Sequence, residues 1–312
     1  MSNKLQQLYE EALASYVEGE VASYIPALAS EDRGQFSVSI CDVHGECIHF
    51  GDVTKKFSMQ SVVKVISFMV VCELLGVDEV LKYVDLEPTG DSFNSIKRLE
   101  SSKEPGKPYN PMINAGAITV ASLLPGETVD EQVRHVQSFL ARMIDFVPQV
   151  NEEVYKSEFE ASDHNRAIAY FLKAKGYLKG DVESALKTYF RLCSIEVTTQ
   201  DLAQIGLFFA TDGKIDGVEM DPALFRMTKA LMLTCGMYNA SGKFAAFVGL
   251  PAKSGVSGGI LACAADGVAQ IEHLRGSVGI GLYGPAIDEI GNSVAGVRFL
   301  TRLVEEYGVR GF

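Results

Sequence analysis

Apolar and polar residues alternate near the two ends of the chain, whereas helical spacing dominates the middle. Residues 36–41 (Phe-Ser-Val-Ser-Ile-Cys) alternate apolar and polar side chains, and residues 46–50 (Glu-Cys-Ile-His-Phe) do so again. A period of two is typical of strands that bury one face. Turn-forming residues at 42–45 separate the two segments, so the pattern predicts a β-hairpin.

The last third of the chain contains the short apolar runs of a sheet. We predict strands over residues 244–250, 259–264, 267–271 and 277–283, with a hairpin turn at 266–267 (Asp-Gly). A helix over residues 293–307 closes the chain. Because strands lie at both ends of the chain, we expect one antiparallel sheet assembled from its N- and C-terminal segments.

Between these ends, apolar residues recur every three or four positions, as amphipathic helices require. We expect Ser58 to cap the first of these helices and Gly76 to end it, and Asp221 followed by Pro222 is a typical helix start. Further helices are predicted over residues 118–124, 131–143, 165–175, 185–193, 199–210 and 222–234, after helix and loop over residues 1–30.

These patterns predict an α+β fold in which helices flank an antiparallel sheet. No linker and no internal repeat interrupts the 312 residues, so we expect a single domain spanning 1–312. A mixed sheet and helix lobe is expected over about 1–60 and 240–312, with a mainly helical lobe inserted over about 61–239. Clefts between lobes are favoured sites for ligands.

The composition limits the partners that we expect. Hydrophobic residues make up 47% of the chain, charged residues 22%, and the formal net charge of −12 disfavours binding to nucleic acids or anionic membranes. Lys64, Ser67 and Glu73 interrupt the longest apolar segment, residues 62–75, so no transmembrane helix is predicted. The first residues resemble no secretory signal, and we expect a cytoplasmic protein.

The cysteines and histidines do not have the spacing of a metal site. The six cysteines, at positions 41, 47, 72, 193, 235 and 263, form no C-x-x-C pair. They could belong to a disulfide framework or a metal site, but we favour reduced core thiols. Neither a phosphate-binding loop nor an H-E-x-x-H zinc helix occurs. We therefore expect no metal and no organic cofactor.

Ser61 and Lys64 form an S-x-x-K pair at the predicted start of a helix. Residues three apart share a helix face, so the lysine amine can take the proton of the serine hydroxyl. The unpaired N–H groups of a first helical turn also favour developing negative charge. The alternative is an ordinary helix start with a lysine that extends to solvent.

A second motif, Lys253-Ser254-Gly255, precedes an apolar strand. S-x-x-K with a later K-T-G is the pattern of penicillin-interacting serine enzymes, and K-S-G replaces one hydroxyl residue by another. We expect the N–H groups of Val256 and Ser61 to form an oxyanion hole. The alternative is a glycine-rich turn, but both motifs in this order favour catalysis.

With these motifs in place, the chain resembles the serine-dependent glutaminase family from about residue 20 to about residue 300. The matching strings lie at 60–64, 87–90, 93–94, 110–118, 157–158, 165–168, 189–194, 235–238, 249–256 and 291–294. The resemblance implies a β-lactamase-like fold. Residues 266–285 match no family string, so the resemblance predicts nothing about them.

The resemblance also implies a set of substrate-contacting residues. They are Ser61, Asn114, Glu158, Asn165, Tyr189, Tyr238 and Val256, with Lys253 and Gly255 in supporting positions. These residue types suit glutamine, because Glu158 can pair with its α-ammonium while Asn114 and Asn165 donate to its α-carboxylate. Either Tyr189 or Tyr238 can pass a proton to the leaving ammonia together with Lys64. Each residue alone is more often structural.

We therefore predict hydrolysis of L-glutamine to L-glutamate and ammonia through a γ-glutamyl-Ser61 ester, with Lys64 as the general base. The resemblance implies a homo-oligomer, either a dimer or a tetramer. One alternative is another acyl-serine enzyme, such as a β-lactamase or a peptidoglycan peptidase. A second is an amino-acid-binding regulatory protein without activity.

Overall fold

A five-stranded antiparallel sheet organises the chain in the computed structural model, which describes residues 4–96, 99–100, 104–214, 217, 219–265 and 271–311. Its strand order is β2-β1-β7-β6-β5. The strands are β1 (Ser37–Asp42), β2 (Cys47–Phe50), β5 (Ala252–Ser254), β6 (Gly259–Ala264) and β7 (Val278–Tyr283). N- and C-terminal segments therefore share one sheet, as predicted, because β1 pairs with both β2 and β7.

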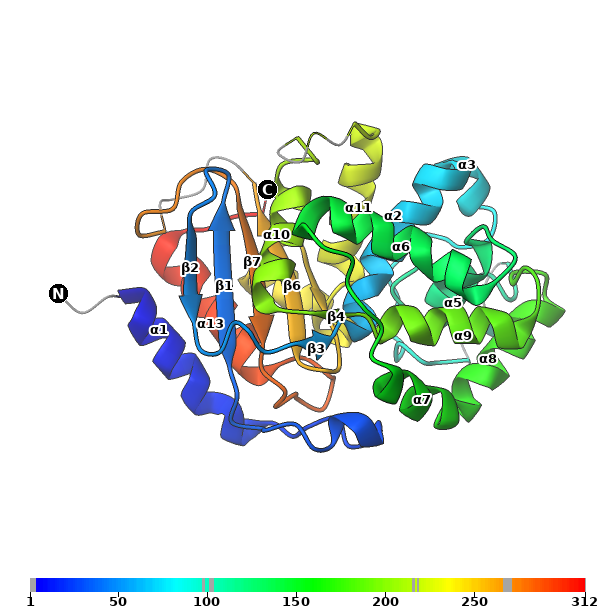
Figure 1. The fold of residues 1–312 in the computed structure, drawn as a ribbon, viewed down its shortest axis with the longest axis horizontal. Helices are drawn as coiled ribbons and strands as arrows, with labels where there is room; N and C mark the ends of the chain where they lie inside the picture. Colours follow the sequence, from blue (N-terminus) through cyan, green and yellow to red (C-terminus); the bar gives the residue numbers. More distant parts are fainter. Residues whose placement is uncertain are drawn as a thin grey trace.

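Different helices cover the two faces of this sheet (Figure 1). The helices α1 (Lys4–Leu13) and α13 (Val294–Tyr307) form an apolar core with one face, while α10 (Thr199–Ala210) packs against the other. A Cβ added at Gly279 of β7 would lie 1.9 Å from the Ala203 carbonyl oxygen of α10. Small residues on this face therefore allow α10 to approach the sheet backbone.

A mainly helical region lies beside the sheet (Figure 1). Besides α10, its helices are α2 (Val63–Leu75), α3 (Val77–Val80), α5 (Asn114–Leu123), α6 (Val129–Ile144), α7 (Glu152–Glu160), α8 (Asp163–Ala174), α9 (Val182–Cys193) and α11 (Pro222–Cys235). The first ten residues of α2 are buried, and this helix packs against α5, α6 and α11. Because α2 is apolar on all sides, it forms the centre of this core.

Several predicted helix ends are confirmed. The Asp221 side chain accepts a hydrogen bond from the Ala223 N–H at the start of α11, and Gly76 ends α2 with φ of 84°. Ser58 is not the cap that we expected, because it lies in β3 (Phe57–Ser58), which pairs with β4 (Glu196–Val197). The short 3₁₀ helix η3 (Gln60–Val62) then leads into α2.

The strand predicted over residues 244–250 is wrong, because this segment begins in the helix α12 (Ser241–Phe247). Phe244 and Val248, four residues apart, are buried, whereas Phe247 is 74% exposed, which is helical periodicity. The predicted turn at 266–267 and most of the predicted strand at 267–271 lie outside the described residues. The strand predicted at 277–283 is confirmed as β7.

The prediction that all six cysteines are reduced is also wrong. Cys41 and Cys47 form a disulfide across the β1–β2 hairpin, where the ladder places them directly opposite each other with Cα atoms 4.2 Å apart. The other four cysteines are free. Within the described ranges, no His, Cys, Asp or Glu cluster has the geometry of a metal site, and no helix is long and apolar enough to cross a membrane.

Candidate active site

Ser61 and Lys64 lie in adjoining helical turns directly after β3. Ser61 is in η3 and Lys64 is in the first turn of α2. Ser61 lines a cavity of about 380 Å³, and Lys64 is only 1% exposed behind it. A nucleophile that faces a cavity while its neighbouring amine is buried fits the predicted pair.

Residues far apart in the sequence line this cavity. The N-terminal segment contributes Tyr24 and Ile25, and residues 287–291 form part of the opposite wall. The remaining lining residues are Gln60, Ser61, Phe93, Asn94, Asn114, Glu158, Ala161, His164, Asn165, Tyr189, Phe190 and Val256. Six of the predicted substrate-contacting residues thus lie around one cavity.

Lys64 makes its hydrogen bonds with α5 and the residues before it. Its Nζ donates to Asn114 Oδ1 at 2.7 Å and to the Met112 carbonyl oxygen at 3.2 Å. Neither bond goes to Ser61. Burial lowers the pKa of Lys64 to about 8, against the opposing influence of Cys193 and Glu158. An amine with this pKa is neutral in part of the molecules near neutral pH and can then accept a proton.

Tyr238 lies behind the cavity wall and interacts with Ser61. Burial raises the pKa of its phenol, and the Ser61 hydroxyl beside it acts in the opposite direction. Apart from this contact with Ser61, the Tyr238 hydroxyl has no hydrogen-bond partner within the described part of the chain. Its backbone has φ of 51°, a left-handed conformation that a bulky residue seldom adopts. Tyr238 is therefore held beside Ser61 as a protonated hydroxyl.

The K-S-G segment lies behind the same wall. Lys253 is fully buried, donates to the Ser254 carbonyl oxygen and lies 4.5 Å from the Tyr238 ring centroid. Burial and the charge of Lys64 hold the pKa of Lys253 well below its ordinary value. A Cβ at Gly255 would lie 2.6 Å from the Met59 carbonyl oxygen, so this position requires glycine. Because Gly255 packs closely against Met59, the next residue, Val256, reaches the cavity beside η3.

The backbone N–H groups of Ser61 and Val256 have no partner among the hydrogen bonds of the described residues. Buried backbone donors are rarely left unpaired in folded proteins. Both residues line the same cavity. These two donors therefore suit an oxygen that carries negative charge.

Glu158 is one of the acidic residues that line the cavity, together with Asp288 and Glu289. It lies on α7 and accepts a hydrogen bond of 2.6 Å from Gln60 Nε2. Burial raises the pKa of this carboxyl to about 7, while the Gln60 bond and Lys64 oppose the rise. The helix α7 was not predicted, although Asn151 caps it and two glutamates follow in its first turn.

Two asparagines and a tyrosine connect the helices around the cavity. Asn114 Nδ2 donates to Asn165 Oδ1 at 3.0 Å, and the Tyr189 hydroxyl donates to Asn114 Oδ1 at 3.4 Å. Since Asn114 Oδ1 also accepts from Lys64, its amide nitrogen must face away from that amine. Burial raises the pKa of Tyr189 well above its usual range. The network fixes the side chains of α5, α8 and α9 relative to Lys64.

The structure brings all the predicted site residues into one region. The other predicted residues lie behind the residues that line the cavity; they are Lys64, Tyr238, Lys253 and Gly255. Sequence reasoning did not select Tyr24 or Gln60 as site residues, although Gln60 directly precedes the nucleophile. His164, on α8, also lines the cavity, and its Nε2 is 2.5 Å from the Asn94 carbonyl oxygen.

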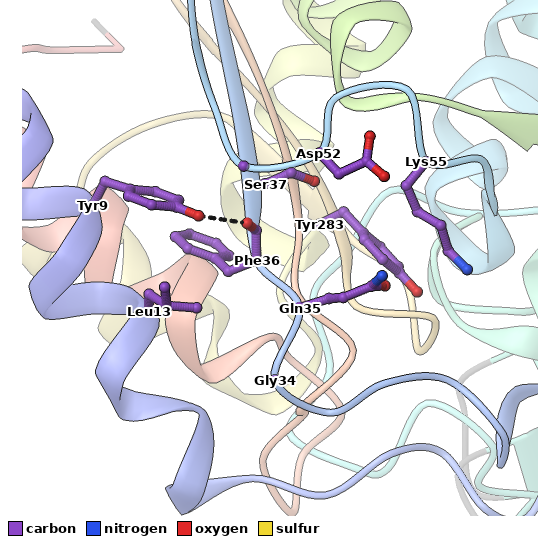
Figure 2. Close-up of a pocket in the computed structure, with 10 residues that line it drawn as sticks. Tyr9, Leu13, Gly34, Gln35, Phe36, Ser37, Asp52, Lys55 and Tyr283 are labelled. Atoms are coloured by element: carbon purple, nitrogen blue, oxygen red, sulfur yellow. Dashed lines mark hydrogen bonds between the residues drawn. The ribbon is translucent and has the colours of Figure 1, made fainter.

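A second pocket, of about 220 Å³, lies beside the N-terminal helix (Figure 2). The Tyr9 hydroxyl in its wall donates to the Phe36 carbonyl oxygen at 2.9 Å. Tyr283 donates to Glu31 at 3.0 Å, and Lys55 pairs with the same carboxylate at 2.8 Å. Because these polar groups already have partners within the protein, the Ser61 cavity is the better candidate for chemistry.

Comparison with known proteins gives consistent results. The family model Glutaminase matches residues 19–312. Glutaminase 2 of Bacillus anthracis is 50% identical over 298 residues, covering 95% of this chain and 91% of that protein. A crystal structure of a probable glutaminase from Bacillus subtilis is 44% identical with a TM-score of 0.91, covering 99% of this chain and 97% of that chain.

A further solved structure contains a covalent adduct. It is the complex between a Bacillus subtilis glutaminase and 5-oxo-L-norleucine, formed by reaction with 6-diazo-5-oxo-L-norleucine. Its sequence is 41% identical, its TM-score is 0.86, and the match covers 98% of each chain.

The antiparallel sheet flanked by helices is the β-lactamase-like hydrolase fold of the solved glutaminases. The agreement of sequence and structure extends over nearly the whole chain. The chain belongs to the glutaminase family and is an enzyme. Both the resemblance drawn from the sequence strings and the predicted fold class are confirmed.

Proposed function

We propose that this enzyme hydrolyses L-glutamine to L-glutamate and ammonia through a Ser61 acyl-enzyme. The observation that carries the proposal is that Ser61 faces the cavity with its own N–H and that of Val256 unpaired, while Lys64, a buried amine of lowered pKa, follows one helical turn later. A Bacillus subtilis glutaminase also forms a covalent complex with 5-oxo-L-norleucine, which shares the amino-acid end of glutamine. That complex supports nucleophilic catalysis in the family.

The substrate binds with its amino-acid end toward α7 and α8. Glu158 pairs with the α-ammonium, and a buried carboxylate is a strong partner for it. Asn165 donates from its amide nitrogen to the α-carboxylate, because its Oδ1 already accepts from Asn114. Asn114 can add its second N–H to the same carboxylate. The cavity volume of about 380 Å³ suits a free amino acid.

The reaction begins when neutral Lys64 takes the Ser61 proton. Ser61 Oγ then attacks the δ-carbon of the amide, and the N–H groups of Ser61 and Val256 bind the oxyanion. The intermediate collapses, the C–N bond breaks, and the leaving nitrogen takes a proton to depart as ammonia. Water then attacks the γ-glutamyl ester with the same groups acting in reverse, which releases glutamate and free Ser61.

Tyr238 is the main proton carrier to the leaving nitrogen. Its hydroxyl interacts with Ser61 and has no other partner within the described residues. The Tyr189 hydroxyl is instead used in a bond to Asn114. Since burial raises the pKa of Tyr238, the phenol stays protonated at neutral pH and can donate. Lys64 restores that proton.

An ammonia-release assay on glutamine, asparagine and a γ-glutamyl peptide tests the proposal, with nitrocefin hydrolysis as the assay for a β-lactamase. We expect turnover of glutamine and its loss in Ser61→Ala. Ser67→Ala is the matched control, since Ser67 is a buried serine of α2 outside the cavity. Near-normal turnover by Ser61→Ala, or binding of glutamine without ammonia release, contradicts the mechanism.

A further inference from the structure

Gln60, the residue before the nucleophile, has a backbone conformation that glutamine rarely adopts. Its φ is 49°, in the left-handed region, and its side chain is only 2% exposed. Such conformations persist only where surrounding contacts enforce them, and they gather at functional sites. Five described residues other than glycine have a positive φ, and two of them, Gln60 and Tyr238, flank Ser61 in space. The strained backbone of Gln60 therefore indicates a functional role for this residue.

The Gln60 side chain connects η3 to α7. Its Nε2 donates to Glu158 Oε1 at 2.6 Å and to Ser58 Oγ at 3.2 Å, which uses both amide hydrogens. The Gln60 Cβ also lies in a tight space, 3.2 Å from where a Cβ at Gly255 would be. The amide is thus fixed in direction by three separate segments of the chain.

A hydrogen bond to an ionised carboxylate is short and strong, and it fixes the carboxylate plane. Among the described residues, Glu158 accepts a side-chain bond only at Oε1. With Oε1 held by Gln60, Oε2 is left to pair with a cation in the cavity. Glu158 lies on the cavity wall together with Gln60 and Ser61, so such a cation would lie close to the nucleophile.

We propose that Gln60 is the positioning residue for the substrate's ammonium group: its amide orients the Glu158 carboxylate, while its left-handed backbone directs Ser61 into the same cavity. The inference rests on the proposed function. Gln60 thereby couples recognition of the amino-acid end to placement of the nucleophile, because one residue controls both.

The coupling predicts a specific pH dependence. The groups that face Glu158 are Lys64 from α2, Tyr24 from the N-terminal segment, and Tyr189 and Cys193 from α9. Of these, Lys64 is the one that favours the ionised carboxylate. Removing the Gln60 donor raises the pKa of Glu158 above its present value of about 7. Glu158 is then less ionised at pH 6.5, whereas at pH 8.5 most of its charge remains.

The test compares Gln60→Met with Gln60→Gly. Both variants lose the donor, but only glycine adopts the left-handed conformation without strain. For each variant we expect an increase of about 10-fold or more in the KM for glutamine at pH 7. In Gln60→Gly, kcat should change by less than about 3-fold, whereas in Gln60→Met, whose strained backbone is no longer held by the two amide bonds, kcat should also fall by more than about 3-fold. The competitive inhibition constant of L-glutamate should rise by a similar factor and that of glutarate, which lacks the ammonium, by much less. The increase in KM should be larger at pH 6.5 than at pH 8.5.

Ser58→Ala is the matched control, because it removes the other partner of the Gln60 amide and leaves Glu158 untouched. Its KM should stay within about 2-fold of wild type. A wild-type KM in Gln60→Gly, or equal increases for L-glutamate and glutarate, overturns the inference. Absence of ammonia release by the wild-type enzyme would instead refute the proposed function.

Discussion

In the proposed mechanism, Lys64 must lose its proton before it can deprotonate Ser61, and burial determines how often it does so. With a pKa of about 8, roughly 10% of the Lys64 amines are neutral at pH 7. An exposed lysine with the ordinary pKa of 10.5 would be neutral in only about 0.03% of molecules. Burial therefore increases the population with a neutral Lys64 by a factor of a few hundred, on the order of 3 kcal/mol.

The measurable consequence is the pH profile of kcat/KM, which reports the free enzyme. The proposed mechanism requires neutral Lys64 together with ionised Glu158, whose pKa is about 7. Both requirements make kcat/KM rise with pH, by roughly 10-fold from pH 7 to pH 8 and more steeply below pH 7. Lys64→Arg should lose at least about 100-fold at every pH, because a guanidinium stays protonated.

The assay is ammonia release from glutamine between pH 6 and pH 8.5, with protein stability followed at each pH by circular dichroism. Lys82→Arg is the control, because Lys82 is an exposed lysine paired with Glu79 far from the cavity. It should reproduce the wild-type profile. A profile that is flat between pH 6 and pH 8.5, or Lys64→Arg with more than a tenth of wild-type activity, refutes the role of Lys64.

Three further predictions concern the proton carrier, the core and the disulfide. Tyr238→Phe should lower kcat by about 100-fold while changing KM by less than about 3-fold, and an equal effect on KM would refute it as the proton carrier. Gly279→Ala should lower the unfolding free energy by at least about 3 kcal/mol in urea titrations, since its Cβ would meet α10 backbone, whereas Gly242→Ala, in open space, should change it by less than about 1 kcal/mol. Cys47→Ser should cost about 2 kcal/mol for the loop of sequence separation 6 and leave kcat unchanged, so a loss of activity at full folding would contradict a purely structural bridge.

The sequence pattern was sufficient to predict the bounds of helices and strands whose ends are set by neighbouring residues. The helix α10 and the strand β6 have the bounds that the sequence predicts, because a capping threonine precedes the first and glycine begins the second. The segment beginning at Phe244 could not be assigned by period, since short apolar runs suit a strand or a helix equally. Its packing against α11 decides in favour of the helix.

Six of the residues named from the sequence as substrate contacts line one cavity, but the hydrogen bonds between them could not be predicted. Ser61 and Lys64 are close in sequence, so their proximity follows from helix geometry. The bond from Gln60 to Glu158 joins residues 98 positions apart, and nothing near either residue indicates the other. The disulfide could be predicted in part, because the predicted hairpin already brings Cys41 close to Cys47.

Some hydrogen-bond donors around Ser61 are left unpaired within the protein, and the proposed reaction explains why. Around Ser61, the N–H groups of Ser61 and Val256 have no partner within the described residues, and the hydroxyl of Tyr238 has none besides Ser61. In the proposed mechanism, the amide substrate in its ground state uses these donors weakly, whereas the tetrahedral intermediate presents an oxyanion and a basic leaving nitrogen to them. A site whose unsatisfied donors match that intermediate stabilises the transition state more than the substrate. Filling any of these donors with an internal bond would therefore make the protein more stable and the enzyme slower.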